Sequence, residues 1–168
     1  MTVNEIIKES NSSKGSFYLH FGSKHQIFME KFKEIDAHYT DYIKTLPPQM
    51  PAPEKILLFI GDQMQYIETE LGKDLMRVIY STALKVNQSD YFQDYERPLF
   101  QILFSFIKEG QENNEIKESV SIQNLQFIIF QGMLGAIYHW CMSDEYYSLK
   151  QESEDLFISI IEYYKTKI

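Results

Sequence analysis

The stretch TVNEIIKESNSSKGSFYLHFGSK, residues 2–24, has the pattern of two short helices joined by a tight turn. Thr2 and Glu5 have the spacing of a capping box, in which a hydroxyl and a carboxylate satisfy the first free amides of a helix. Ser12 or Ser13 can cap the second helix, which ends at Gly22. The amino end of that second helix exposes small polar residues, and its free amides and helix dipole favour a phosphate there. The stretch therefore predicts a helix-turn-helix, whose second helix enters the major groove of DNA.

Taken alone, residues 12–16 are more typical of a surface helical hairpin that carries ordinary caps. The longer run resembles the DNA-binding segment of the tetracycline-repressor (TetR) family of bacterial transcriptional regulators. The match is dense and ordered from residue 2 to residue 28. The matching residues are Thr2, Ile6, Ser13, Lys14, Gly15, Ser16, Phe17, Tyr18, His20, Phe21, Ser23, Lys24, Ile27 and Phe28.

The resemblance implies an all-α protein with an N-terminal helix-turn-helix head, residues 1–33. A C-terminal helical ligand-sensing and dimerisation domain, residues 34–168, is expected to follow. The resemblance also implies that some head residues hold phosphates and others lie along the groove, whereas Leu19 departs from the polar residue often found there. The expected DNA-binding residues are Thr2, Ser12, Ser13, Lys14, Gly15, Ser16, Tyr18, His20 and Lys24.

The beginning of the sequence departs from the family pattern. Family members carry another helix before the position of Thr2, packed under the helix-turn-helix, whereas this sequence starts at Met1. We therefore expect a fragment or a misplaced start. The second hypothesis is a helical small-molecule-binding or interaction dimer that does not bind DNA, because the first helix is missing.

The charge distribution is compatible with a DNA-binding head. The whole chain has a net charge of −8, which by itself argues against nucleic acid. Residues 1–33, however, carry five lysines against three glutamates, a net charge of +2, while the remainder carries eleven basic against twenty-one acidic residues, a net charge of −10. A slightly basic head on an acidic body presents one face to DNA, although so small an excess is weak evidence alone.

Apolar residues at helical spacing predict a series of helices after residue 23. Four of the five prolines lie between residues 47 and 53, which we expect to be a loop between the first two of these helices. Gly110 is expected to close one helix, and residues 110–121 to form a loop anchored by Ile116 alone. The expected helices cover residues 23–46, 54–71, 74–86, 98–110, 121–142 and 148–164.

The last two helices carry more apolar surface than one small subunit can cover. The helix beginning after Ser121 is apolar over most of its circumference, so it must be buried on more than one side. A twofold-symmetric four-helix interface between two chains would bury this surface. We therefore expect a homodimer, with a larger monomer core as the alternative.

The ligand-sensing domain is rich in aromatic and methionine side chains, which line pockets for small organic molecules but more often form plain core. We expect a small apolar or aromatic effector. The candidate ligand-binding residues are Met64, Tyr80, Phe104, Phe127, Phe130 and Met133.

No enzyme, cofactor or metal site is predicted. The four histidines show no metal-ligand spacing, and the sequence has neither a phosphate loop nor a nucleophile elbow. The single cysteine, Cys141, favours a reducing compartment, and a cytoplasmic protein is expected. The longest apolar stretch, residues 127–142, is interrupted by Gln131, Gly132, Gly135 and His139, so no membrane partner is expected.

Overall fold

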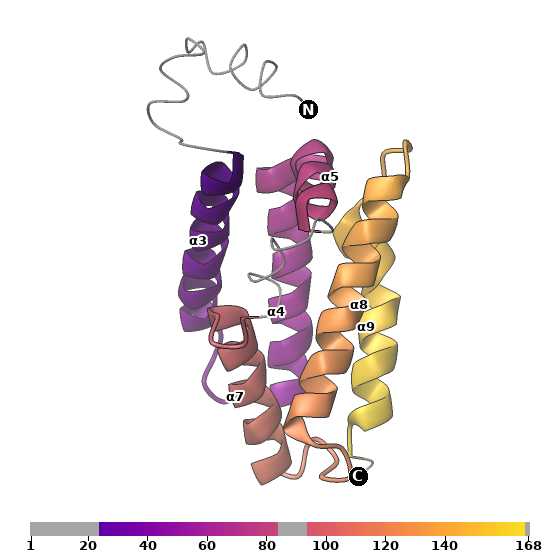
Figure 1. Ribbon diagram of the computed structural model, residues 1–168. Helices are drawn as coiled ribbons and strands as arrows, with labels where there is room; N and C mark the ends of the chain where they lie inside the picture. The colour runs from indigo at the N-terminus through magenta and orange to yellow at the C-terminus, as the bar shows by residue number, and fades with distance from the viewer. Residues whose placement is uncertain (1–23, 84–93, 167–168) are drawn as a thin grey trace.

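The computed structural model describes residues 24–83 and 94–166, which form a bundle of helices (Figure 1). This part of the chain has no β-strand, apart from one isolated bridge between Ile116 and Lys165. The predicted all-α class is thereby confirmed. The helical elements are α3 (Lys24–Tyr42), η1 (Ile43–Thr45), α4 (Ala52–Tyr66), η2 (Ile67–Leu71), α5 (Gly72–Ala83), α7 (Pro98–Glu112), α8 (Ile122–Met142) and α9 (Leu149–Tyr164).

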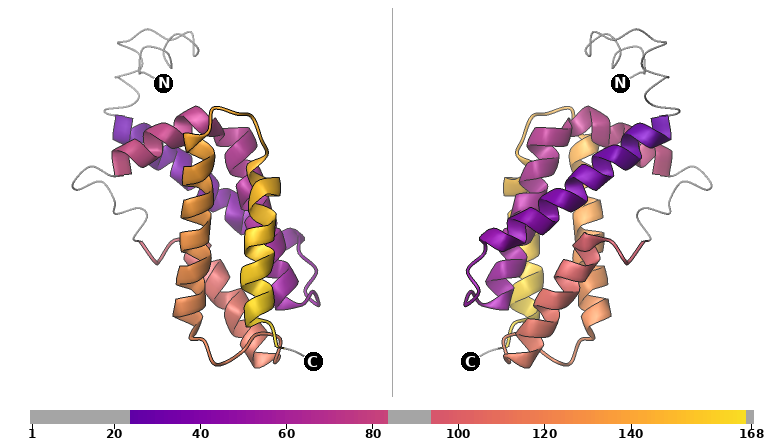
Figure 2. Two further views of the ribbon diagram at one scale, coloured as in Figure 1. Left: turned by 90° about the vertical axis from the view of Figure 1, so that its right-hand side faces the viewer. Right: turned by 90° about the vertical axis from the view of Figure 1, so that its left-hand side faces the viewer.

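Helix α4 lies at the centre of the bundle. It contacts α3, α7, α8 and α9, and α3 crosses the body diagonally beside it (Figure 2). The inward side chains of α4 are almost inaccessible to solvent, with Ile56, Phe59 and Met64 at 0% exposure. Burying such side chains contributes about 1.5–3 kcal/mol each. The packing around α4 therefore holds the other helices in place.

A buried lysine also ties α4 to α7. The Lys55 side chain is 8% exposed, and its Nζ lies 2.6 Å from Oε1 of Glu109 on α7. It also donates a 3.0 Å hydrogen bond to the carbonyl of Pro48. A buried charge is tolerated only when it is paired and hydrogen-bonded in this way. The hydrophobic pattern alone did not predict this link.

The predicted helix ends are mostly correct, with one difference near the prolines. Ser121 and Ser148 cap α8 and α9 as predicted, by accepting hydrogen bonds from the backbone amides of Asn124 and Gln151. Helix α4, however, begins at Ala52 rather than Glu54. Pro53 lies in its first turn, where the missing amide costs nothing, so the last prolines begin a helix instead of extending the loop.

The connection between α4 and α5 is a tight bend rather than a simple stop. Residues 67–71 form a π-helical turn, and Gly72 then adopts a φ of 73°. Such a positive φ is accessible to glycine at little cost. Gly72 was expected only to end the preceding helix, and it also begins α5.

Gly110 lies inside α7 and does not end the helix as predicted. Helix α7 continues to Glu112, and Asn114 then takes the left-handed conformation, with a φ of 59°. Gly110 is buried against the loop that follows, and a Cβ at this position would lie 2.6 Å from Cδ1 of Ile116. Glycine is needed here because the loop approaches the helix closely.

The loop between α7 and α8 is fastened to the end of α9. Lys117 donates its backbone amide to the carbonyl of Tyr164 at 2.9 Å, and Thr166 donates its amide to the carbonyl of Glu115 at 2.9 Å. Ile116 is 2% exposed, and Val120, at 6%, is a second buried anchor that the sequence did not predict. Two segments distant in sequence therefore meet at this end of the bundle.

Helix α8 differs from the expectation that no apolar stretch is long enough to span a membrane. Among the helices in residues 24–83 and 94–166, it alone is long and apolar enough by length and composition. It nevertheless packs against α5, α7 and α9, and 44% of the apolar window is buried within the protein. This is the pattern of a core helix.

Gly110→Ala should lower the stability of the fold. The added methyl group would also lie 2.8 Å from Cγ1 of Ile116 and 3.1 Å from Cβ of Ala52. Overpacking of this kind costs roughly 1–3 kcal/mol, which exceeds the helix-propensity gain of up to about 1 kcal/mol. Urea denaturation measures the change in the free energy of unfolding. An unchanged or raised midpoint would contradict the close approach seen here.

Candidate ligand site

The predicted DNA-binding residues lie almost entirely outside the residues that the structure describes. Lys24 is the first residue of α3, and its side chain is not among the described ones. The predicted contacts outside the described residues are Thr2, Ser12, Ser13, Lys14, Gly15, Ser16, Tyr18 and His20.

Three of the six predicted ligand-binding residues share one cavity. Tyr80 of α5 and Phe130 and Met133 of α8 all line it. Met64 is fully buried in the core elsewhere, with 0% exposure. Phe104 is half-buried on α7 and does not line this cavity. Phe127, at 49% exposure, lies on the outer surface of α8.

This core cavity has a volume of about 40 Å³ and lies between α3, η2, α5, α7 and α8. It is far smaller than a typical small-molecule pocket of about 300–1,000 Å³, so an organic ligand would have to push the surrounding side chains and helices apart. Most of its wall is aliphatic or aromatic, so it favours an apolar ligand. The residues that line it are Ile35, Tyr39, Ile67, Leu71, Met76, Tyr80, Arg97, Leu99, Phe130, Met133, Leu134 and Ile137.

The charged group in this wall is already neutralised. Arg97, which is 6% exposed, directly precedes α7. Its Nη2 lies 2.8 Å from Oδ1 of Asp36 on α3, and its Nε lies 3.3 Å from Oδ2. Such a two-pronged pair is the strong geometry for a guanidinium and a carboxylate. The pair joins α3 to α7 beside the cavity, and sequence reasoning missed it.

Two tyrosine hydroxyls add polar groups to the apolar wall. Burial raises the pKa of Tyr39, and the nearby Asp36 raises it further, while Arg97 opposes the shift. Burial also raises the pKa of Tyr80, whose hydroxyl donates to the carbonyl of Leu134 at 2.9 Å. Both side chains therefore stay protonated at neutral pH and can serve as hydrogen-bond donors.

The cavity suits binding rather than catalysis. No cluster of histidine, cysteine and carboxylate side chains that could hold a metal ion occurs among the described residues. Cys141 is buried and lies outside the cavity wall, and burial raises the pKa of its thiol. Apolar walls with a few fixed polar groups instead bind and orient an organic ligand.

Helix α3 connects the cavity to the N-terminal segment. Ile35 and Tyr39 of α3 line the cavity directly. On the next turn, Nε2 of His38 lies 2.6 Å from Oδ2 of Asp62 on α4, and the His38 ring stacks on Tyr66 with centroids 4.1 Å apart. A ligand that moves α3 must therefore change the contacts that α3 makes on two sides of the helix.

A helical body with an apolar core cavity, preceded by a segment with the helix-turn-helix pattern, defines a ligand-sensing transcriptional regulator. The comparisons with known families agree. Residues 1–30 match the model for bacterial regulatory proteins of the tetR family, and residues 32–162 match the model for the C-terminal region of YsiA-like proteins. The chain belongs to the tetR family of bacterial regulatory proteins.

Known relatives come from Bacillus subtilis (strain 168). The chain is 24% identical over 151 residues to a fatty acid metabolism regulator protein, covering 88% of this chain and 76% of that protein. It is 22% identical over 120 residues to the uncharacterized HTH-type transcriptional regulator YvdT, covering 71% of this chain and 61% of that protein. These relatives are regulators rather than enzymes.

A solved structure has the same fold. The crystal structure of the transcriptional regulator FadR from Bacillus subtilis in complex with stearoyl-CoA matches with a TM-score of 0.72 and 23% sequence identity. The match covers 96% of this chain and 87% of that chain. The helical body behind a helix-turn-helix head is therefore a known arrangement.

Asp36→Asn should destabilise the protein strongly, because it leaves the buried Arg97 charge without its counter-ion. Breaking a buried pair from one side costs about 3–5 kcal/mol. Chemical denaturation measures the loss, and the double variant Asp36→Leu with Arg97→Met should recover most of it, since a hydrophobic pair of similar volume leaves no buried charge. A loss below about 1 kcal/mol, as for a surface pair, would contradict this interpretation.

Proposed function

We propose that this protein is a dimeric transcriptional repressor in the cytoplasm, released from its operator by a small apolar molecule. Residues 1–33 form the DNA-binding head and residues 34–168 the sensing and dimerisation body. The observation that carries the proposal is the apolar core cavity next to α3, behind a segment that matches the tetR family model.

A long acyl chain is the effector that the cavity supports best. Aliphatic side chains from four helices and η2 form most of its wall, and this suits a saturated chain. FadR, which shares the fold, was solved with stearoyl-CoA. The apolar character of the cavity is consistent with an acyl chain that enters from the surface, and its volume of about 40 Å³ means that the helices must separate to admit the chain.

The ion pair in the wall favours a neutral head group on that chain. Arg97 already pairs with Asp36 through two nitrogens, so a free fatty acid would have to displace a buried carboxylate to reach the guanidinium. Displacement would leave Asp36 unpaired, and an unpaired buried charge is costly. An ester or thioester, which carries no charge at the acyl end, meets no such penalty.

Transmission to DNA would run through α3. A ligand shifts an equilibrium only by its different affinity for the two states, so it must contact an element that moves. Ile35 and Tyr39 place α3 in the cavity wall, and the same helix leads back towards the head. Filling the cavity would change the position of α3 and hence the separation of the two heads.

The dimer would form through α8 and α9, as the sequence predicts. Apolar side chains on their outer surface are half-exposed in the single chain, which is unusual for such large residues. A second copy would cover them in a four-helix interface. The exposed large side chains proposed for this interface are Phe127, Tyr138, Met142, Leu156 and Tyr163, whereas Ile158 lies on the α4 side of α9.

Met133→Trp should make the protein insensitive to its effector. Met133 is 3% exposed and lines the core cavity, so a larger side chain would occupy space needed by an acyl chain. A gel-shift titration on the DNA upstream of its gene measures the outcome. We expect stearoyl-CoA to release the unmodified protein from DNA and to require a concentration at least about tenfold higher for the variant.

Two results would contradict this proposal. If the unmodified protein binds no specific sequence at low salt while folded, the non-DNA-binding dimer becomes the better hypothesis. If it binds DNA but ignores stearoyl-CoA and palmitoyl-CoA alike, the acyl effector is wrong and the regulator assignment stands.

Leu156→Glu should weaken the dimer. Leu156 is 43% exposed on the side of α9 nearest α8, and a carboxylate there would be buried by a second copy. Ile158→Glu is the matched control, because Ile158 is 39% exposed but lies on the α4 side of α9. Light scattering measures the molar mass against concentration. A monomer for both variants, or for neither, would contradict the interface.

A further inference from the structure

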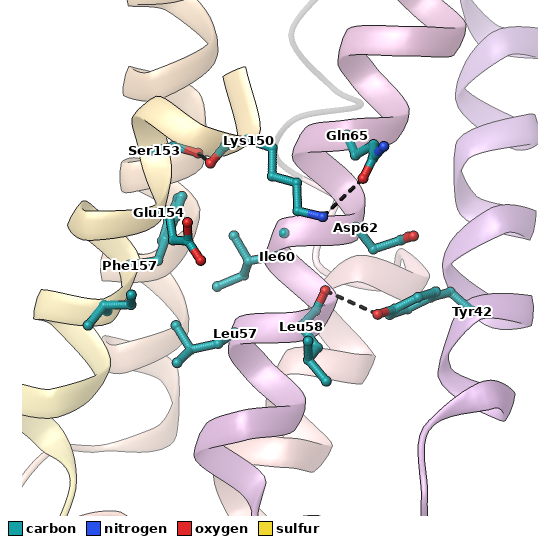
Figure 3. Close-up of a pocket in the computed structure, with 12 residues that line it drawn as sticks. Tyr42, Leu57, Leu58, Ile60, Asp62, Gln65, Lys150, Ser153, Glu154 and Phe157 are labelled. Atoms are coloured by element: carbon teal, nitrogen blue, oxygen red, sulfur yellow. Dashed lines mark hydrogen bonds between the residues drawn. The ribbon is translucent and has the colours of Figure 1, made fainter. Parts of the chain in front are cut away.

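A groove separate from the core cavity runs over the outward face of α4 (Figure 3). Tyr42 from α3 stands on one side of it, and Glu154 and Phe157 from α9 form the other side. Its volume is about 210 Å³, and it shares no lining residue with the core cavity. The groove is therefore a separate space, with room for a small organic molecule.

Gly61 in the floor of this groove has no structural explanation in the helix itself. It lies in the interior of α4, where glycine costs up to about 1 kcal/mol relative to alanine. A Cβ at this position would meet only Cε of Lys150, at an ordinary 3.6 Å. Neither a positive φ nor close packing requires glycine here, in contrast to Gly72 and Gly110. Without a side chain at this position, the Lys150 stem alone lies over this turn of α4.

The groove is apolar along its length and acidic at its edges. Leu57, Ile60 and Phe157 supply the apolar surface, and Leu58 at the rim is 45% exposed. Such a combination of apolar surface and polar rim is typical of sites for amphipathic molecules.

Two carboxylates at this site retain free acceptor atoms. Glu154 points from α9 towards α4 and makes no hydrogen bond or ion pair with the described residues. Asp62 accepts from His38 and Gln63 through Oδ2, so Oδ1 has no partner in the same part of the chain. Lys150 is the cation among the lining residues, and its Nζ donates to Gln65 at 3.0 Å rather than to either carboxylate. The lining side chains thus carry more negative than positive charge.

The groove also contacts the helix that leads to the DNA-binding segment. Asp62 bonds to His38 of α3, and the hydroxyl of Tyr42, also on α3, donates to the carbonyl of Leu58 at 3.3 Å. A cation bound at Asp62 would compete with His38 for the same carboxylate. Occupancy would therefore alter a contact between α3 and α4.

We infer that the groove between α3, α4 and α9 is a second ligand site, which takes a small amphipathic organic cation: a protonated amine on an apolar chain. The apolar part lies over Gly61 against Leu57 and Phe157, and the ammonium group faces the free oxygens of Glu154 and Asp62. This inference does not depend on the identity of the effector in the core cavity.

Isothermal titration calorimetry on the full chain with n-octylammonium tests the site, with n-octanol and octanoate as probes of equal chain length. We expect saturable binding of one octylammonium per chain, about tenfold or more tighter than that of octanol, since the ammonium adds a charge-assisted contact. Octanoate should bind more weakly still, because the groove would repel its carboxylate.

Four variants assign the binding to the groove. Gly61→Leu fills the floor and should weaken octylammonium binding about tenfold or more, while the better helix propensity of leucine preserves the fold. Gly61→Ala adds one methyl group at an uncrowded position and should change the affinity by less than about twofold. Glu154→Gln should weaken octylammonium binding by about threefold to tenfold and leave octanol binding unchanged. Asp155→Asn, one residue further along α9 and outside the groove, is the charge control and should have no effect.

Three results would each contradict the inference. The first is that octylammonium does not bind, and the second is that octanol binds as tightly as octylammonium. The third is that Gly61→Leu leaves binding undiminished, which would place the ligand elsewhere, including the core cavity. Thermal unfolding of each variant accompanies the titration, and a Gly61→Leu protein that melts no lower than the unmodified chain shows that lost binding is not lost folding.

Discussion

The body of the protein depends on the burial of α4. This helix contacts α3, α7, α8 and α9, and its inward side chains are sealed from solvent. A core close-packed in this way transmits displacement, because its side chains have little room to move independently. The outward face of α4 is different, since it carries Gly61 and the exposed Leu58 where neighbouring helices leave space. The core cavity and the outer groove therefore both lie at places where the packing of helices is incomplete.

Helix α3 is common to the two spaces. Tyr39 faces the core cavity and Tyr42, one turn further on, faces the outer groove. Two polar contacts hold α3 beside its buried Ile35 and Tyr39: Asp36 to Arg97 on one side, and His38 to Asp62 on the other. A helix held by a few such contacts suits the part of a regulator that must move.

Part of this structure is predictable from sequence, and the reason differs from element to element. Helix positions and the serine caps of α8 and α9 follow from local rules, because a cap and an apolar stripe involve residues within one or two turns. Pro53 and Gly110 were misassigned because each residue has two uses. Proline can end a loop or begin a helix, and glycine can end a helix or admit a close neighbour. Only the tertiary contacts decide which of these roles each residue takes.

The core cavity and the outer groove were harder to predict from the sequence. Tyr80, Phe130 and Met133 share the cavity wall, yet the same pattern also selected Phe127 on the surface. Helix α8 is apolar nearly all round, so its spacing cannot tell the face that meets the core from the face that meets a partner. The pair of Asp36 and Arg97 joins residues far apart in the chain, and the outer groove lies between α3, α4 and α9. Neither the ion pair nor the groove produces a periodic pattern in the sequence.

The hydrogen bonds between the loop after α7 and the end of α9 affect how the helical body unfolds. Backbone amides of residues 117 and 166 cross between the two segments, next to the buried Ile116. The last turn of a terminal helix normally frays first, but here it cannot do so without releasing the loop that precedes α8. The carboxy-terminal helix and the hairpin of α7 and α8 thus open as one cooperative unit, and the slowest amide hydrogens to exchange should include those at the very end of the described chain.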